Sequence, residues 1–314
     1  MIIPKYLQPG DKIHIVSPAG KIKEEHIYPA VEWLTNQGYK VELGKHVFAG
    51  HFQFAGTDNQ RLNDLQSALD DTETAAIICS RGGYGTIRIL DKLDFTQFKQ
   101  NPKWLAGFSD ITILHACLNN LGVTSIHGAM PRYFFDEKSL PNENLNSLIQ
   151  LLKGEKVHYN FKSEKLNKKG SATGELVGGN LSIICSLLGT KYEIDTSGKI
   201  LFLEDIDEYL YHTDRMIHQL KLSGKLAHLA GLVLGDFTDM KDNESPFGKS
   251  VNEIIAEAVE EFSFPVCFGF SAGHDKKNLA LAFGRKWELD VGEQNSNLGI
   301  KQVINDLRTK KNKE

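Results

Sequence analysis

A serine at a predicted strand-to-helix turn is the first candidate for chemistry in this sequence. The stretch Lys103-Trp-Leu-Ala-Gly107 predicts a short apolar strand, and the residues directly after Ser109 have helical spacing. A serine at such a turn has its hydroxyl beside the N-terminus of a helix, where backbone N–H groups can stabilise a developing oxyanion. Ser109 is therefore a candidate nucleophile. The competing interpretation is an ordinary helix N-cap.

Two later segments supply an acid and a base in an order that a catalytic triad can use. Leu201-Phe-Leu-Glu-Asp-Ile206 predicts a strand that ends in carboxylates, and Phe268-Gly-Phe-Ser-Ala-Gly-His274 predicts a strand that leads into a glycine-flanked histidine. Open α/β sheets place their sites at the carboxyl ends of strands, so Ser109, Glu204 and His274 form a candidate triad. The alternatives are a solvated acidic loop around Glu204 and a structural role for His274.

A glycine-rich loop is the third candidate element. Ser80-Arg-Gly-Gly-Tyr-Gly85 follows a predicted buried strand and precedes a predicted helix, so its backbone N–H groups can approach a ligand closely. The loop has neither the Gly-x-Gly-x-x-Gly spacing of a dinucleotide site nor the Gly-Lys-Ser/Thr ending of a P-loop. We interpret it as an oxyanion hole. A tight turn that binds no ligand is the alternative.

The elements that must position these residues alternate along the first half of the chain. Apolar strands are predicted at 11–18, 40–43, 75–79 and 103–107, and helices at 27–37, 59–69 and 86–92. Alternation of this kind is typical of a parallel, doubly wound sheet.

The second half predicts another α/β unit. Residues 131–170 are polar and rich in lysine and asparagine, which suits a connection between domains. Beyond it, strands are predicted at 199–204, 230–234 and 265–268, and helices at 181–188, 211–222 and 250–262. We therefore expect an N-terminal domain over 1–135, a connecting segment over 136–170 and a C-terminal domain over 171–314, with a frayed tail from Lys301.

Composition narrows the possible partners. The 36 basic and 40 acidic residues leave a net charge of −4, so no basic surface for nucleic acid or an anionic membrane is indicated. No signal-peptide core and no run of roughly 18 apolar residues is found, so we expect a cytoplasmic protein. The four cysteines are far apart, without metal-ligand or disulfide spacing. No metal or other cofactor is expected.

In the serine turn, the glycine loop and several other motifs, the chain resembles the LD-carboxypeptidases, a family in the serine peptidase clan that also contains the microcin C self-immunity peptidases. The resemblance extends from about Lys12 to Gly292. The matching motifs, in chain order, are Ser80-Arg-Gly-Gly-Tyr-Gly85, Gly107-Phe-Ser-Asp110, His127-Gly128, Gly178-Gly-Asn-Leu181 with Leu188-Gly-Thr190, Leu203-Glu-Asp205 followed by Arg215, and Gly273-His274.

The resemblance implies a Ser-Glu-His triad at Ser109, Glu204 and His274. It implies that backbone N–H groups of Asp110 and of the Gly82-Gly83 segment hold the oxyanion, and it leaves open which glycine donates. It also implies a Rossmann-like N-terminal parallel-sheet domain, a C-terminal swivelling β/α domain that carries Glu and His of the triad, a homodimer, and no metal or cofactor.

The implied substrate is a murein tetrapeptide. It would be cut between the L-centre of its diamino acid and the terminal D-alanine during cell-wall recycling. Within the family, the alternative is hydrolysis of a microcin-type aminoacyl-sulfamoyl adenylate. From another class, the alternative is a two-domain sensor that binds a small ligand without chemistry.

Two arginines are candidates for substrate binding. A carboxypeptidase must bind a free terminal carboxylate, and a guanidinium matches that group better than an ammonium does. Arg81 lies in the glycine loop and Arg215 lies on the helix after Glu204; for each, a structural ion pair is the alternative. Thr112 occupies the second glycine position of Gly-x-Ser-x-Gly, which argues against an α/β-hydrolase fold.

Overall fold

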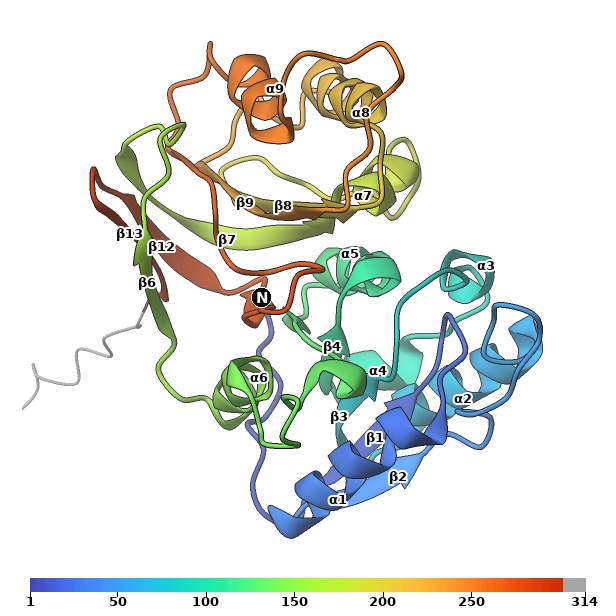
Figure 1. The fold of residues 1–314 in the computed structure, drawn as a ribbon. Coiled ribbons are helices and arrows are strands. Elements are labelled where there is room, and N and C mark those ends of the chain that lie inside the picture. The colour runs from blue at the N-terminus through green and yellow to red at the C-terminus, as the bar shows by residue number, and fades with distance from the viewer. Residues whose placement is uncertain (302–314) are drawn as a thin grey trace, which may run out of the picture.

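The computed structural model describes residues 1–301 and has an α/β fold built on two sheets. In Figure 1 the first sheet lies in the lower half of the molecule and the second sheet lies above it. The frayed tail expected beyond Lys301 lies outside the described residues.

The first sheet has six strands in the order β11-β5-β4-β3-β1-β2. Its parallel strands are β1 (Lys12–Val16), β2 (Lys40–Leu43), β3 (Thr74–Cys79), β4 (Trp104–Gly107) and β5 (Ser125–His127). A short strand from late in the chain, β11 (Leu281–Phe283), pairs antiparallel with β5. The central strand β3 is buried along most of its length, as expected where helices cover both faces of a parallel sheet.

The helices of this half are α1 (Tyr28–Asn36), α2 (Asp58–Asp70), α3 (Ile87–Leu90), α4 (Thr96–Gln100), α5 (Thr112–Asn120) and α6 (Glu143–Lys153), with short 3-10 helices η1 (Glu24–His26), η2 (Ser109–Ile111) and η3 (Pro131–Tyr133). Two of the α-helices begin at a capping side chain. Thr57 and Gln60 form a capping box at the start of α2. Asn142 caps α6, which ends at Gly154 with a φ of 74°.

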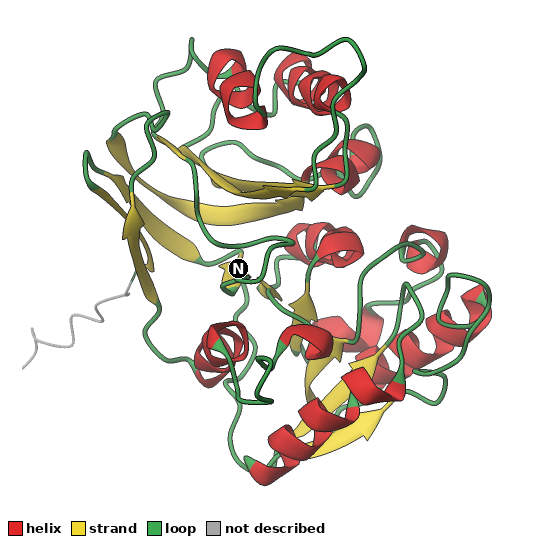
Figure 2. Ribbon diagram, in the orientation of Figure 1, coloured by secondary structure: helices red, strands yellow, loops and turns green. Residues whose placement is uncertain are grey.

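The second sheet has seven strands in the order β10-β9-β8-β7-β12-β13-β6. Its strands are β6 (His158–Lys162), β7 (Gly170–Asn180), β8 (Ile200–Ile206), β9 (Gly231–Thr238), β10 (Val266–Cys267), β12 (Lys286–Val291) and β13 (Asn295–Ile300), and its helices are α7 (Leu181–Leu187), α8 (Leu210–Leu222) and α9 (Val251–Ala258). Strands β7 to β10 are parallel, and the remaining pairs are antiparallel. Figure 2 shows the three helices together over one face of this sheet.

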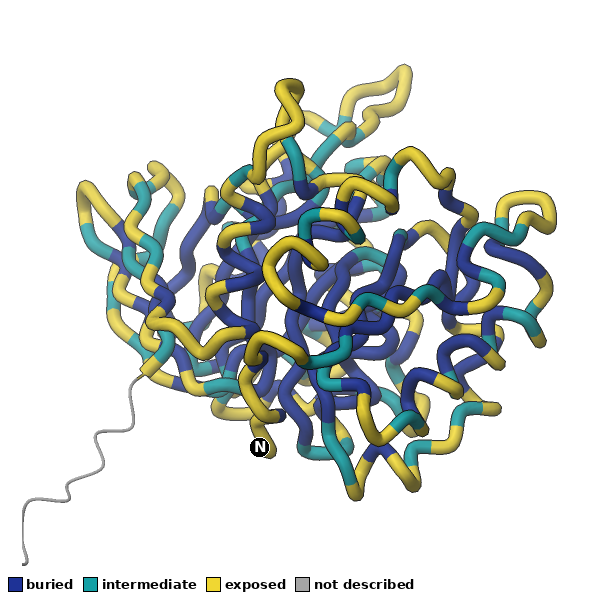
Figure 3. Tube along the Cα trace, turned by 90° about the horizontal axis from the view of Figure 1, so that it is seen from below, coloured by how far each residue is buried: buried dark blue, intermediate teal, exposed yellow. Residues whose placement is uncertain are grey.

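One hydrophobic core joins the two sheets. It contains α1 and α6, one face of the first sheet, and residues of the second sheet such as Phe202, Phe270 and Trp287. Two further clusters lie under α7, α8 and α9 and beneath α2, α4 and α5. Figure 3 shows this interior as continuous buried chain, with exposed segments mainly at the periphery. Burial on this scale is the main stabilising term of the fold.

The strand order predicts where a ligand binds. In a sheet with the order 5-4-3-1-2 the connections reverse direction between β1 and β3, and open α/β sheets bind ligands outside the carboxyl ends of the strands at such a point. The loops after β1 and β3 lie at this edge, and so does the turn after β4 that contains Ser109.

The structure corrects two expected elements. The helix expected at 86–92 is the four-residue α3, and the strand expected at 265–268 is the two-residue β10, so His274 lies on a loop rather than at a strand end. The domain limits remain a prediction; α6 and β6 fall inside the expected connecting segment, and β11 returns to the first sheet. Among residues 1–301, no helix is both long enough and apolar enough to cross a bilayer.

Candidate active site

Ser109 occupies a strained turn between β4 and α5. Its φ is 64°, a left-handed conformation that costs a non-glycine residue about 1 to 3 kcal/mol and is concentrated at functional sites. The residue begins η2, and α5 starts only at Thr112; neither helix uses Ser109 as its N-cap. The N-cap interpretation is therefore wrong, and the turn presents the hydroxyl in the manner of a nucleophile elbow.

The strand end before Ser109 is held by buried hydrogen bonds. The carbonyl of Gly107 accepts from the Gly128 amide at 3.1 Å and from His115 Nε2 at 2.9 Å. Because a carbonyl only accepts, His115 carries its proton on Nε2, and its Nδ1 accepts from the Ser125 hydroxyl at 2.9 Å. Burial lowers the pKa of His115 to about 4, so the ring is neutral near pH 7. His115 therefore donates a buried hydrogen bond that holds the strand end before Ser109.

Thr112, which does not fit the hydrolase pattern, connects the two halves of the molecule. Its hydroxyl oxygen accepts from the Asn180 amide at 3.1 Å. A Cβ atom at Gly179 would lie 2.5 Å from the same oxygen, so β7 can approach the nucleophile helix only with glycine at that position. The Gly-Gly-Asn motif at the end of β7 therefore places the second sheet against α5.

Glu204 and His274 form a buried pair. Glu204, on β8, has no exposed surface, and its Oε2 lies 2.6 Å from Nδ1 of His274, whose side chain is 11% exposed. This excludes the solvated acidic loop considered for Glu204 and shows that a buried carboxylate holds His274. Gly273, with a φ of 136°, leads the chain into His274, and a Cβ atom there would lie 3.1 Å from Glu204 Oε2.

His274 lies beside the turn that contains Ser109. Its ring centroid is 4.9 Å from that of Phe108, the residue before Ser109. Within residues 1–301 no hydrogen bond joins Ser109 to His274, whose Nδ1 bonds Glu204. The structure therefore brings together Glu204 and His274 by direct contact, and it brings His274 and Ser109 together through Phe108.

Three carboxylates act on the charge of His274. Burial alone would lower the pKa of His274, but the hydrogen bond to Glu204 and the negative charges of Glu204, Asp205 and Asp236 outweigh it, so the pKa lies above its ordinary value of 6.5. Burial and neighbouring carboxylates raise the pKa of Asp236 to about 7. Asp205 is turned to the start of α7, where it accepts from Asn180 Nδ2 at 2.8 Å and from the Ser182 amide at 3.0 Å.

The raised pKa predicts the pH dependence of a reaction that uses His274 as a base. The base is active only when deprotonated, so kcat/KM should rise with pH, with a midpoint above 6.5. Asp236→Asn removes a negative charge that favours the imidazolium and should move the midpoint to lower pH. The measurement is kcat/KM against pH, with the exposed Asp239→Asn as the control. A midpoint that moves upward, or does not move, would contradict this electrostatic account.

The glycine loop lies directly against Ser109. A Cβ atom at Gly82 would lie 2.8 Å from Ser109 Cβ and 3.0 Å from its Oγ, so only glycine fits there. The amide N–H groups of Gly82 and Gly83 donate to no backbone or side-chain acceptor among the described residues. Asp110 follows Ser109 in η2. These positions leave backbone donors next to the serine hydroxyl, as an oxyanion hole requires.

The arginine candidates differ in their surroundings. Arg81 is half-buried, and its Nη1 donates to the Lys21 carbonyl at 2.8 Å. Arg215 is exposed on α8, with its guanidinium 5.3 Å from the Tyr211 ring. Neither forms an ion pair within the described part of the chain. The role of each in binding stays a prediction.

Arg132 is a third arginine near the site, and sequence reasoning missed it. It lies in η3, with its guanidinium 5.8 Å from the ring of Tyr133, which in turn is 5.9 Å from the Phe108 ring. Burial lowers the pKa of His26, and the positive charges of Arg132, Lys23 and Arg81 lower it further, against the opposing charge of Glu25. The only sequence signal was its position shortly after His127-Gly128.

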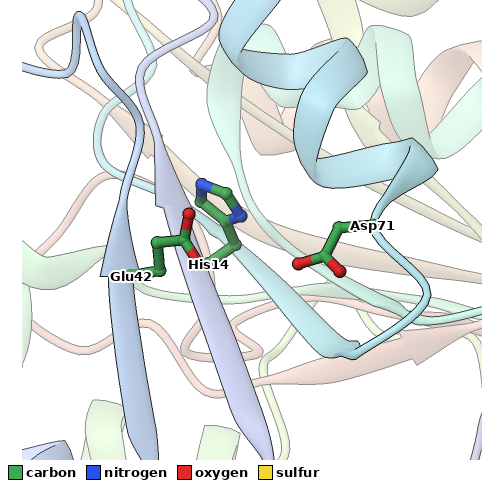
Figure 4. A group of neighbouring side chains, drawn as sticks. All are labelled: His14, Glu42 and Asp71. Carbon is green, nitrogen blue, oxygen red and sulfur yellow. The ribbon is translucent and has the colours of Figure 1, made fainter.

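One group of potential metal ligands lies away from Ser109. Among residues 1–301, ligand atoms of His14, Glu42 and Asp71 lie within 4.8 Å of one another (Figure 4). Asp71 precedes β3, so the group belongs to the amino-terminal side of the first sheet, whereas Ser109 follows a carboxyl end. The Lys12 ammonium lies 3.1 Å from Glu42 and 3.0 Å from Asp71 and already supplies the positive charge that a cation would bring.

Comparisons with known proteins cover nearly the whole molecule. The family model of the LD-carboxypeptidase N-terminal domain matches residues 13–128, and that of the LD-carboxypeptidase C-terminal domain matches residues 173–289. Together they span more than half of the chain and contain Ser109, Glu204 and His274.

Similar proteins are found in several bacteria. A probable murein peptide carboxypeptidase of Bacillus subtilis is 36% identical, with 93% of this chain and 92% of the relative covered. A murein tetrapeptide carboxypeptidase of Pseudomonas aeruginosa is 32% identical, with 88% of this chain and 93% of the relative covered. The crystal structure of muramoyltetrapeptide carboxypeptidase from Oxalobacter formigenes has a TM-score of 0.84 at 30% identity and covers 93% of this chain and 99% of its own.

Proposed function

The chain belongs to the LD-carboxypeptidase family, and on that premise we propose that it is a serine carboxypeptidase that removes the terminal D-alanine from a murein tetrapeptide. The observation that carries the proposal is the buried hydrogen bond between Glu204 and His274 beside a serine in a left-handed turn. A binding protein has no need for a strained serine with a paired imidazole next to it.

In the acylation step, His274 takes the proton of the Ser109 hydroxyl as Ser109 attacks the carbonyl of the diamino acid. Glu204 keeps the imidazole oriented through Nδ1 and stabilises the imidazolium. The N–H groups of Asp110 and of the Gly82-Gly83 segment hold the oxyanion. His274 then protonates the leaving nitrogen, and D-alanine departs.

In the deacylation step, water replaces D-alanine. His274 takes a proton from the water as it attacks the ester formed at Ser109, and the same N–H groups hold the second oxyanion. Collapse of this intermediate releases the tripeptide and returns the proton to the Ser109 oxygen. All the groups that this cycle requires are protein side chains and backbone amides.

Arg81 and Arg132 fit the recognition of a terminal carboxylate. Arg81 lies in the glycine loop, Arg132 lies beside Tyr133, whose ring is 5.9 Å from that of Phe108, and neither arginine has a carboxylate partner within residues 1–301. The side that carries His274 is acidic instead, with Glu204, Asp205 and Asp236 close to it. A peptide with a free carboxylate is therefore attracted to the arginine side.

Amidation of the substrate tests this recognition. Converting the terminal D-alanine to its amide should raise KM about 10- to 100-fold, because charge-assisted hydrogen bonds of about 1.5 to 3 kcal/mol are lost. In Arg81→Gln or Arg132→Gln, KM for the acid should approach KM for the amide; Arg215→Gln tests the remaining candidate. Arg285→Gln is the control, since that guanidinium donates to the Tyr6 hydroxyl at 2.9 Å. Equal KM values for acid and amide in the unaltered protein would refute carboxylate recognition.

The setting of this activity is inferred from the family resemblance. We infer a homodimer that works in the cytoplasm on muropeptides released during cell-wall recycling. Size-exclusion chromatography with light scattering tests the dimer. Fractionation of cells tests the compartment.

A paired substrate assay tests the function itself. The pure protein is incubated separately with a murein tetrapeptide and with an aminoacyl-sulfamoyl adenylate, and the products are followed by mass. We expect the tetrapeptide to lose one D-alanine and the adenylate to remain intact. Cleavage of the adenylate alone would establish the microcin-type alternative. Binding of both without products or acylation would establish a sensor.

A further inference from the structure

Two buried charged side chains that have no role in the proposed chemistry lie beside the glycine loop. Arg61, on α2, and the side chain of Asp110 are each 1% exposed. Burying a charged group is costly unless its polar atoms find partners. The partners of these two side chains therefore show which parts of the structure they hold.

Arg61 connects the three loops that follow β1, β2 and β3. Its Nε donates to the Pro18 carbonyl at 3.0 Å, its Nη1 to the Gly56 carbonyl at 2.8 Å, and its Nη2 reaches the Gly85 carbonyl at 3.5 Å. Nη2 also donates to Asp58 Oδ1 at 2.6 Å, which balances the charge. One guanidinium thus spans the edge of the sheet where the site lies.

Asp110 holds the far end of the glycine loop. Its Oδ2 accepts from the Thr86 amide at 2.9 Å, directly after Gly85. Burial raises the pKa of Asp110, while the bond from the Thr86 amide and the charge of Arg61 oppose that rise. Since Asp110 follows Ser109 in the chain, this bond ties the loop to the nucleophile turn itself.

The near end of the loop is held by backbone alone. The Gly20 amide donates to the Gly82 carbonyl at 3.0 Å, and a Cβ atom at Gly20 would lie 2.8 Å from that oxygen. Gly20 belongs to the same post-β1 loop that Arg61 holds at Pro18. The two amides proposed for the oxyanion, Gly82 and Gly83, therefore lie between an anchor at Gly20 and anchors at Gly85 and Thr86.

We propose that Arg61 and Asp110 are positioning residues of the oxyanion hole, which hold the Gly82-Gly83 amides at the distance from Ser109 that the tetrahedral intermediate requires. The proposal rests on the proposed function. A loop with glycine at three of four positions has large conformational freedom, and an oxyanion hole stabilises the transition state only when its donors are already in place. Arg61 and Asp110 restrict the conformation of this glycine-rich loop through their hydrogen bonds to Gly85 and Thr86.

Three variants separate positioning from charge and from folding. Arg61→Lys keeps the charge but cannot reach three carbonyls in different directions. Asp110→Ala removes the acceptor for the Thr86 amide, whereas Asp110→Asn keeps an acceptor oxygen of the same size. Arg88→Gln is the matched control, because Arg88 bonds the same Asp58 from the exposed side, at 2.8 Å from Oδ2.

The readouts distinguish the ground state from the tetrahedral state. Each variant is first shown to be folded by its thermal transition. We then measure kcat and KM for the murein tetrapeptide, the inhibition constant of a peptide boronic acid that forms a tetrahedral adduct with serine, and the Kd of the tripeptide product. Loss of one oxyanion donor costs about 10² to 10³ in kcat, so a displaced loop should cost about 10- to 100-fold.

We expect Arg61→Lys and Asp110→Ala to lower kcat by this factor, with KM and the Kd of the tripeptide almost unchanged. The inhibition constant of the boronic acid should rise by the same factor. Asp110→Asn should retain most of the activity, and Arg88→Gln all of it. The positioning role is refuted if the folded Arg61→Lys and Asp110→Ala variants keep the kcat of the unaltered protein. It is also refuted if their kcat falls while the inhibition constant of the boronic acid stays the same. Failure of the unaltered protein to cleave the tetrapeptide would refute the proposed function instead.

Discussion

Ser109→Ala is expected to abolish turnover of the murein tetrapeptide, with a loss of about 10⁴ to 10⁶ in kcat. The substitution removes the nucleophile, and the residual rate comes only from binding and the oxyanion hole. The fold should persist, because only one oxygen atom is removed and Ser109 caps no helix. The measurement is D-alanine release by the variant and the unaltered protein at saturating substrate.

Stability and substrate binding are the controls for this variant. Alanine tolerates the left-handed φ of 64° about as poorly as serine does, so the thermal transition should change little. Tetrapeptide should still bind, and its Kd should lie close to the KM of the unaltered protein. A variant that keeps more than about a tenth of the activity would show that another residue is the nucleophile.

Glu204→Gln is expected to lower kcat by about 10² to 10⁴. The nucleophile and the base remain, but the imidazolium loses its counter-charge, and a glutamine side chain at 2.6 Å from Nδ1 can present either oxygen or nitrogen to His274. Because Glu204 is fully buried, water cannot replace the lost charge. The measurement is kcat together with its pH profile, whose midpoint should move to lower pH as the base weakens.

Asp207→Asn is the matched control for Glu204→Gln. Asp207 is nearby in sequence but exposed, and its carboxylate pairs with Lys241 at 2.6 Å. It should leave kcat unchanged, since surface ion pairs of this kind contribute little. If Glu204→Gln is neutral while Asp207→Asn or Asp205→Asn is inactive, the triad carboxylate has been assigned to the wrong residue.

The turn at Ser109 and the strand that carries Glu204 could be predicted because their signals are local. An apolar strand that breaks at Gly107 before a serine, and an apolar strand that leads into the carboxylates Glu204 and Asp205, are patterns of a few consecutive residues. The alternation of strands and helices likewise predicted the parallel part of the first sheet. Each of these features depends on the residue's own segment.

The features of the fold and the site that the sequence did not predict depend on contacts between distant segments. His274 lies on a loop seven residues after the end of β10, and what holds it is Glu204, 70 positions away. The return of β11 to the first sheet and the three antiparallel strands β6, β12 and β13 gave no clear pattern either. Arg61 donates to backbone carbonyls, which every residue has, so no sequence motif predicts these hydrogen bonds.

The acyl-enzyme is the intermediate on which the account depends, and its detection tests the central claim most directly. The protein is mixed with a murein tetrapeptide analogue whose terminal D-alanine is replaced by D-lactate, because an ester leaves faster than an amide and lets the acyl-enzyme accumulate. After an acid quench, mass spectrometry of the digested protein locates the adduct. We predict one tripeptidyl group on the peptide that contains Ser109, and none in Ser109→Ala. Release of D-lactate with Ser109 unmodified, or an adduct on another residue, would contradict the serine mechanism proposed for this chain.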